Sequence, residues 1–477
     1  MQSVQEWAQS EFGGADLGDV RLERRLVLLA SEVAARPAGT VTRACSTPAS
    51  REGAFRFLEN PAVRPDAVLA CVQRATLRRL PMAGHIIVPV DGTSLHITDR
   101  KRSKGLGAIG SHEKGARGIH VMTALAVHPD GQPIGILTQK TWTRPARSRR
   151  TDRDHMKPGG ESAHWVSVLR TCQEAFAELP AIRPWYQLDR GADCWQVLSH
   201  AVNAGILVTI RAAHDRRLDD ELDRLSEALE TAPVIAKRTI EVPARGPRDR
   251  LKRVGGRQRI KDIIPARAAR TARVEVRATS VAVVLTNDRH KRVVELNAVL
   301  VREIRRSRDA LSWVLLSTHS IACRRDVLEV VRAYTLRWRV EDFHRAWKTG
   351  LCRVEDTQLR SRNAIVKWAT LLSSVATRAM RLAHQARTTP DAPATTEFSP
   401  AELEALIALR APTSHDHEQL SLALAVRWLA ELGGYTGPWN GPPGATVIGR
   451  GLHDLLVVSR AFANRARAST PQHRKKR

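Results

Sequence analysis

The stretch from Tyr334 to Lys348 constrains this chain most, because its side chains separate into two faces at helical spacing. At about 100° per residue, one face of a continuous helix would be polar. That face carries Tyr334, Arg337, Glu341, Arg345 and Lys348. The opposite face is apolar and is expected to pack against a sheet. It carries Leu336, Val340, Phe343 and Trp347.

A single carboxylate, Glu341, therefore stands in a row of cations and a phenol. Carboxylates bind divalent cations, and arginine and lysine side chains hold phosphate oxygens. The pattern predicts a place where a metal ion meets a phosphodiester. The plainer alternative is a surface ion pair between Glu341 and Arg337 or Lys348.

The charge of the whole chain points to a polyanionic partner. Among 477 residues, 76 Lys and Arg oppose 49 Asp and Glu, which gives a formal net charge of +27. So large an excess is typical of proteins that approach nucleic acid. An arginine-rich coding bias is the alternative, since arginine far outnumbers lysine.

Cysteine usage and hydropathy indicate a cytoplasmic protein. The six cysteines are scattered and form no Cys-x-x-Cys pair, which argues against a zinc ribbon and a disulfide framework. The first residues lack the apolar core of a signal peptide. No apolar run approaches the roughly 18 residues expected of a membrane-spanning helix.

Changes in residue pattern along the chain predict four parts. A helical unit covers 1–75 and an α/β unit covers 76–386, with a β-rich, basic insertion at about 212–310. Apolar helices follow at 400–465, and 466–477 forms a basic, disordered tail. In the insertion, 245–261 predicts a loop or hairpin tip that could lie on DNA.

The α/β unit shows the element order of an RNase H-like mixed sheet. Strands are predicted at 85–91, 119–127 and 134–143, then a helix, a strand at 185–189, a helix at 193–203 and a strand at 206–211. Asp91 closes the first strand and Asp189 the fourth. These strands are neighbours in such a sheet, so the two acids are expected to face each other. Asp193 is expected to cap the following helix rather than to bind a metal.

With Glu341 brought alongside, these acids would form a three-carboxylate pocket. Like charges within a few ångströms repel one another, and divalent cations remove that cost. Oxygen-only ligands favour Mg²⁺, for which Mn²⁺ can substitute. Two such ions can polarise an attacking oxygen and stabilise a leaving oxygen, which points to phosphodiester cleavage or transfer.

Tyr334, Arg337, Glu341 and Lys348, with two, three and six residues between them, resemble the YREK signature of bacterial insertion-sequence transposases of the DDE class. Asp91-Gly-Thr-Ser94 resembles that family's first aspartate motif, and Asp189-Arg-Gly-Ala-Asp193 its second. Gly191 stands where relatives often carry an acid. Similarities at Trp7-Ala, Leu17-Gly-Asp19, 52–57 and 432–434 extend the resemblance over nearly the whole chain.

The resemblance implies a cut-and-paste transposase of the bacterial cytoplasm and nucleoid. Asp91, Asp189 and Glu341 would bind two Mg²⁺ ions and cut double-stranded DNA at the element's ends. The freed 3′-OH would form a hairpin, and a second hydrolysis would open it before strand transfer into target DNA. A homodimer formed through the C-terminal helices would hold both ends.

The resemblance also implies residues that contact DNA. Arg337 and Lys348 would hold end phosphates, Tyr334 the terminal backbone, and Arg211 another part of the end. Trp313 would stack on a base flipped from the hairpin, although its spacing fits a core position equally well. From the spacing alone, Asp19 can cap the basic helix that follows it. That helix carries Arg21 and Arg25, which could read a duplex or form a solvated face.

Three alternatives stay open. A catalytically silent relative, acting as an inhibitor or domesticated DNA-binding protein, would keep the charge and the N-terminal helices. A general RNase H-like nuclease would cut branched or hybrid substrates regardless of end sequence. The apolar helices of 400–465 could pack on their own chain instead of a second copy.

Overall fold

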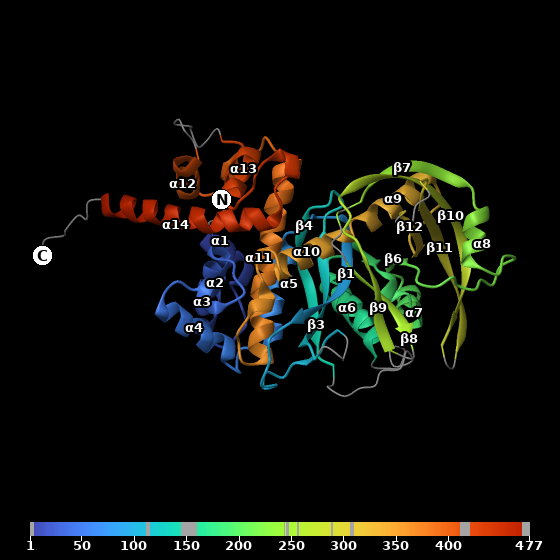
Figure 1. Cartoon of the computed structure of the whole chain (residues 1–477), viewed down its shortest axis with the longest axis horizontal. Coiled ribbons are helices and arrows are strands. Elements are labelled where there is room, and N and C mark those ends of the chain that lie inside the picture. The colour runs from blue at the N-terminus through green and yellow to red at the C-terminus, as the bar shows by residue number, and fades with distance from the viewer. Residues whose placement is uncertain are drawn as a thin grey trace, which may run out of the picture. The chain divides into compact units, whose positions relative to one another are not determined.

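A computed structural model describes residues 4–469 except 111–114, 145–159, 243, 245–247, 255–256, 288–289, 306–309 and 411–419. Its contacts form two compact units (Figure 1). The first comprises Met1–Pro184 and Leu336–Arg477, and the second Trp185–Thr335. The domain boundaries expected from the sequence stay predictions.

The first unit begins with five helices. These are α1 (Val4–Phe12), α2 (Val20–Ala35), α3 (Val41–Ala44), α4 (Pro48–Glu59) and α5 (Pro65–Arg78). The expected cap at Asp19 is confirmed, because its side chain accepts a hydrogen bond from the Arg21 backbone N–H. The other end of the same α2 helix is held by apolar packing, since Leu26, Leu29 and Val33 are buried.

The strands of the first unit are antiparallel. β1 (Gly84–His96) pairs with β3 (Arg117–Val127), which also pairs with β4 (Pro133–Trp142) and with the short β2 (Gly107–Ala108). The expected end of the first strand at Asp91 is wrong. β1 continues to His96 because Gly92 to His96 keep pairing with β3, so Asp91 lies within the strand, opposite Thr123.

The remaining helices of the first unit follow later in the chain. They are α6 (Glu161–Phe176), α10 (Trp338–Lys348), α11 (Arg362–Thr388), α12 (Pro400–Arg410), α13 (Leu422–Leu432) and α14 (Ala445–Ser469). The end of α14 reaches into the segment expected to be a disordered tail. Residues 470–477 of that tail lie outside the described residues.

The apolar content of 400–465 has a partner within the same chain. Leu420, Leu422, Val426 and Leu429 are buried in one cluster with residues of α11, α12 and α14. Leu424 and Trp428 pack against that cluster. These helices therefore pack on their own chain, which was the alternative to a C-terminal dimer interface, and their hydrophobicity does not itself indicate such an interface.

The second unit contains parallel and antiparallel strand pairs. β5 (Ile182–Leu188) pairs in parallel with β6 (Leu207–Arg211), and β12 (Ser312–Ser317), β11 (Lys291–Glu303), β10 (Arg270–Thr286) and β7 (Val234–Val242) follow in antiparallel order. Its helices are α7 (Trp195–Asn203), α8 (Leu225–Thr231) and α9 (Arg324–Thr335).

The basic segment, for which the sequence left a loop or a hairpin tip open, forms a hairpin: β8 (Arg248–Val254) pairs with β9 (Arg257–Ile264). The chain is thus a mixed α/β protein, with parallel and antiparallel strand pairs, as expected of an RNase H-like core. In the part of the chain that the structure describes, no helix has both the length and the apolar character needed to cross a membrane.

Candidate active site

Helix α10 carries the polar residues of the signature and is fixed by its apolar face. Val340, Phe343 and Trp347 are fully buried, as expected, and α10 packs on β1, β3 and α11. The Trp347 Nε1–H donates to the Ala369 carbonyl at 2.9 Å, and its ring stacks on Phe343. The buried face therefore sets the rotation of α10 and with it the direction of its polar side chains.

The expectation of one continuous helix from Tyr334 to Lys348 is wrong. α9 ends at Thr335 and α10 begins at Trp338, and the Thr335 hydroxyl donates to the Arg332 carbonyl. β-Branched and aromatic residues are weak helix formers, and such hydroxyls compete with helical hydrogen bonds. Tyr334 consequently belongs to α9 in the second unit, while Arg337 precedes α10 in the first.

One guanidinium bridges two of the predicted catalytic acids. Arg337 Nη1 lies 3.6 Å from Asp91 Oδ2, and Arg337 Nη2 donates to Glu341 Oε1. The Arg337 side chain is only 11% exposed, whereas that of Glu341 is 46% exposed. Asp91 and Glu341, which are far apart in the sequence, thus meet at one guanidinium, and the Glu341 side chain remains accessible to solvent.

Lys348 is held at the other end of α10. Its Nζ donates to Thr93 Oγ1 at 3.2 Å and lies 3.5 Å from Glu355 Oε1. Glu355 also accepts a hydrogen bond from the His96 backbone N–H at 2.8 Å. Sequence reasoning missed Glu355, because no spacing rule connects a residue beyond α10 with the far end of β1.

Within the described residues, no group of three or more His, Cys, Asp or Glu side chains is arranged to hold a metal ion. Asp91 and Glu341 form a pair around Arg337. Asp189 belongs to the second unit, where it caps a short 3₁₀ turn and its Oδ1 accepts from the Gly191 N–H at 2.8 Å. The three-carboxylate pocket stays a prediction.

Two family models match the chain. Residues 4–63 match the transposase DNA-binding model, and residues 228–377 match the transposase DDE domain. These matches support a DNA-binding transposase of the DDE type. The second match includes Glu341 and the whole signature but begins after Asp91 and Asp189.

Two aromatic residues of the DDE match pack together in the second unit. Trp313 on β12 is 3% exposed, and its ring meets Tyr334 of α9 edge-on, with centroids 5.2 Å apart. Such pairs stabilise a core beyond their buried area. Both rings are therefore buried, and their contacts to DNA stay predictions.

Arg211 and Asp193 are also held by protein groups in the second unit. Arg211 ends β6, and its Nη2 donates to the Ser312 carbonyl at 2.9 Å. The expected capping role of Asp193 is wrong. Its carboxylate accepts from the Ala213 N–H at 2.7 Å and from Arg216 Nε at 2.8 Å, while Cys194 occupies the cap position of α7.

The N-terminal match contains the two arginines expected to contact a duplex. Arg21 is exposed and pairs with Asp19 at 2.8 Å. Arg25 lies across Gly53 of α4, where an added Cβ would stand 2.6 Å from the guanidinium carbon. Arg25 thus packs between α2 and α4, whereas Arg21 points to solvent.

His344 lies on α10 near the bridged acids and is buried. Burial lowers the pKa of its imidazole to about 3, and the positive charges of Lys348 and Arg337 act in the same direction. His344 is consequently neutral at neutral pH. It adds no charge to the acid pair.

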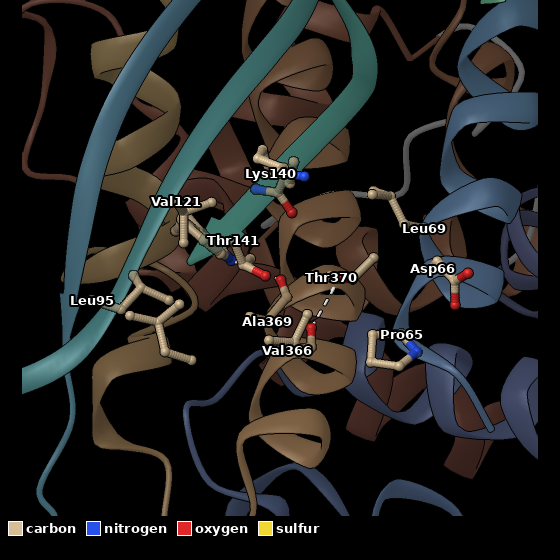
Figure 2. Close-up of a pocket in the computed structure, with 13 residues that line it drawn as sticks. Pro65, Asp66, Leu69, Leu95, Val121, Lys140, Thr141, Val366, Ala369 and Thr370 are labelled. Atoms are coloured by element: carbon tan, nitrogen blue, oxygen red, sulfur yellow. Dashed lines mark hydrogen bonds between the residues drawn. The ribbon is translucent and has the colours of Figure 1, made fainter. Parts of the chain in front are cut away.

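A cavity of about 310 Å³ lies among α5, α10, α11 and the sheet of the first unit (Figure 2). Two of its polar side chains are engaged with protein. Gln139 donates to Thr123 at 3.2 Å. The Thr370 hydroxyl donates to the Val366 carbonyl at 3.0 Å. None of the predicted catalytic or DNA-contacting residues lines it. The cavity is therefore separate from the candidate active site.

Proposed function

We propose that the chain is a Mg²⁺-dependent cut-and-paste transposase whose catalytic acids are Asp91, Asp189 and Glu341. The observation that carries this proposal is the Arg337 guanidinium, which brings Asp91 and Glu341 together on β1 and α10. The match of residues 228–377 to a transposase DDE domain supports it independently.

The residues present fit a divalent metal. Asp91 and Glu341 offer carboxylate oxygens, which hard cations prefer, and a guanidinium already supplies the positive charge that their proximity requires. We propose that these acids and Asp189 hold two Mg²⁺ ions, for which Mn²⁺ can substitute. When bound, such ions polarise the attacking oxygen and stabilise the leaving oxygen.

In this proposal the cations at the two ends of α10 position the scissile phosphate. Arg337 would hold a phosphate oxygen with its planar fork of N–H donors. Lys348 is kept in place by Thr93 and Glu355 and adds a second positive charge. The burial of Trp347 and Phe343 limits the movement of α10, which follows directly on Arg337 and ends at Lys348.

The proposed reaction exchanges one phosphorus–oxygen bond for another at each step. A water oxygen attacks the end phosphate, and the 3′ oxygen leaves and takes up a proton. That 3′-OH attacks the opposite strand and forms a hairpin, which a second water opens. The regenerated 3′-OH then attacks target DNA.

We propose further DNA contacts from both units. Arg21 and Arg25 bind the duplex through the N-terminal match, and Arg211 and Tyr334 bind the end of the element. Stacking of Trp313 on a flipped base requires its ring to leave Tyr334, and the stack would recover about 1–3 kcal/mol per base.

A two-fold homodimer on DNA is proposed because both ends of an element must be cut in one complex. Its site of action is the bacterial nucleoid in the cytoplasm. The apolar residues of 400–465 lend this dimer no support, since they are covered within the chain.

The test is cleavage of a supercoiled plasmid carrying the inverted repeats that flank the gene. With Mg²⁺, the protein should release the element by double-strand cuts at both ends. Glu341→Gln should abolish cleavage and leave end binding intact, because the change removes a metal-binding charge without altering size. The matched control is Glu404→Gln, at an exposed position on α12, which should cleave normally.

Two results would contradict the proposal. Cleavage by Glu341→Gln at the normal rate would exclude Glu341 from catalysis. Binding of matched ends without any cleavage would instead favour the catalytically silent relative.

A further inference from the structure

A groove of about 720 Å³ in the first unit is built from four segments of the chain. One wall is the chain from Arg36 to Arg43, at the end of α2 and in α3. A second is the loop after α10, around Arg353. The end of α13 and the first half of α14, which contacts α2, complete the groove. The groove contains none of the predicted catalytic acids.

The groove gathers cations. Arg36, Arg43, Arg353 and Arg450 line it together with His453, and only Asp356 and Asp454 oppose them. Arg353 forms an ion pair with Asp356 at 2.9 Å. Among the residues that the structure describes, Arg36, Arg43 and Arg450 make no ion pair with a carboxylate. Three unpaired guanidiniums on a concave surface attract an anion more strongly than the same charges on a flat one.

The walls are held at close range by glycines. A Cβ on Gly39 would stand 1.9 Å from the Arg353 carbonyl oxygen, and one on Gly449 would stand 2.1 Å from Leu351 Cδ1. The Trp368 indole N–H donates to the Gly39 carbonyl at 2.8 Å. The groove is therefore formed by packed backbone rather than by side chains that meet by chance on the surface.

Arg353 adopts a backbone conformation that is unfavourable for any residue with a Cβ atom. Its φ of 50° and ψ of 43° are left-handed, which costs a residue with a Cβ about 1 kcal/mol or more. The close approach of Gly39 holds this conformation in place. Conformations of this kind persist where the surrounding structure enforces them, often at binding sites.

We propose that this groove binds the phosphodiester backbone of double-stranded DNA, and that Arg450 of α14 supplies one phosphate contact. The inference rests on the proposed function, because the Arg36–Arg43 wall lies within the transposase DNA-binding match. Guanidiniums suit phosphodiester oxygens because they donate two parallel hydrogen bonds. The C-terminal helix thereby extends the DNA-binding surface of the N-terminal segment.

The test measures the salt dependence of binding to a duplex of about 30 base pairs of arbitrary sequence, since phosphate contacts are independent of sequence. Fluorescence anisotropy gives the dissociation constant from about 50 to about 300 mM KCl. Arg450→Gln should weaken binding about threefold and reduce the slope of log Kd against log salt by about 0.9, the value for one lost phosphate contact.

The matched control is Arg427→Gln, at an exposed position on α13 outside the groove. It removes the same charge and should leave both quantities unchanged. A second arm titrates inorganic phosphate by calorimetry into the unmodified protein and into Arg450→Gln. This arm separates a pocket for free phosphate from one for a DNA backbone.

An unchanged affinity and slope in Arg450→Gln would overturn the proposal while leaving the proposed function intact. The same holds if Arg427→Gln has an equal effect, which would reveal only a general charge contribution. Phosphate binding that depends on Arg450, without a change in the duplex slope, would also overturn it. Absence of duplex binding by the unmodified protein would overturn both proposals.

Discussion

Arg337→Gln removes the positive charge that bridges Asp91 and Glu341 and leaves a shorter, uncharged polar side chain. The burial of this ion pair is intermediate between that of a fully buried pair and that of an exposed pair, because Arg337 is nearly buried while Glu341 is almost half exposed. Breaking a buried pair costs about 3–5 kcal/mol, and exposed pairs contribute about 0–1 kcal/mol. We expect the free energy of unfolding to fall by about 1–2 kcal/mol in the absence of divalent metal.

Thermal unfolding with EDTA and with Mg²⁺ distinguishes a bridging role from ordinary packing. With EDTA, Arg337→Gln should melt several degrees below the unmodified protein. Mg²⁺ should raise the melting temperature of the variant more than that of the unmodified protein, because the cation replaces the missing charge and no longer competes with a guanidinium.

The matched control is Arg345→Gln on the same helix. Arg345 is more exposed and lies 3.6 Å from Asp342, so its loss should change stability by less than about 0.5 kcal/mol. Equal Mg²⁺ responses in Arg337→Gln and in the unmodified protein would refute the view that the guanidinium occupies the place of a metal ion.

Three other changes test the surrounding structure by urea or thermal denaturation. Gly39→Ala should cost about 1–3 kcal/mol, because its Cβ meets backbone, whereas Gly444→Ala should be nearly neutral because nothing lies within 4 Å. Burial lowers the pKa of Lys367 to about 8, so above that pH the unfolded chain binds more protons than the folded chain. The free energy of unfolding should therefore rise between about pH 8 and 10.5. Lys367→Met should abolish this rise. Trp313→Ala should cost about 3–5 kcal/mol and Trp313→Phe under about 1.5 kcal/mol, since only phenylalanine keeps an edge contact with Tyr334. Equal losses of stability in the two glycine variants, or in the two tryptophan variants, would contradict the contacts described for Gly39 or Trp313. An unchanged pH profile in Lys367→Met would show that the Lys367 ammonium does not cause the rise in stability.

Local signals in the sequence identified many elements well. The Asp19 cap, the strand that precedes Asp189 and the basic hairpin of β8 and β9 all depend on near neighbours in the chain. Capping, alternation and turn chemistry act over a few residues, so they can be read without knowledge of the fold.

Predictions from the sequence were wrong where the side-chain pattern did not reveal how the backbone continues or breaks. Tyr334 and Arg337 keep helical spacing across the break between α9 and α10, so the pattern could not reveal it. β1 likewise runs past Asp91, because its pairing with β3 compensates for the low strand preference of Gly92. The C-terminal helices looked unpartnered only because their partners lie elsewhere in the chain.

The sequence by itself determined that Glu341 stands among cations on a helix with an apolar back, since that depends only on the spacing of residues within one turn or two. The tertiary structure alone decided that Arg337 reaches Asp91, that Glu355 holds Lys348, and that Arg450 joins Arg36 in one groove. The first and the last of these join segments hundreds of residues apart. They depend on how buried faces and glycines let those segments approach, which no local pattern encodes.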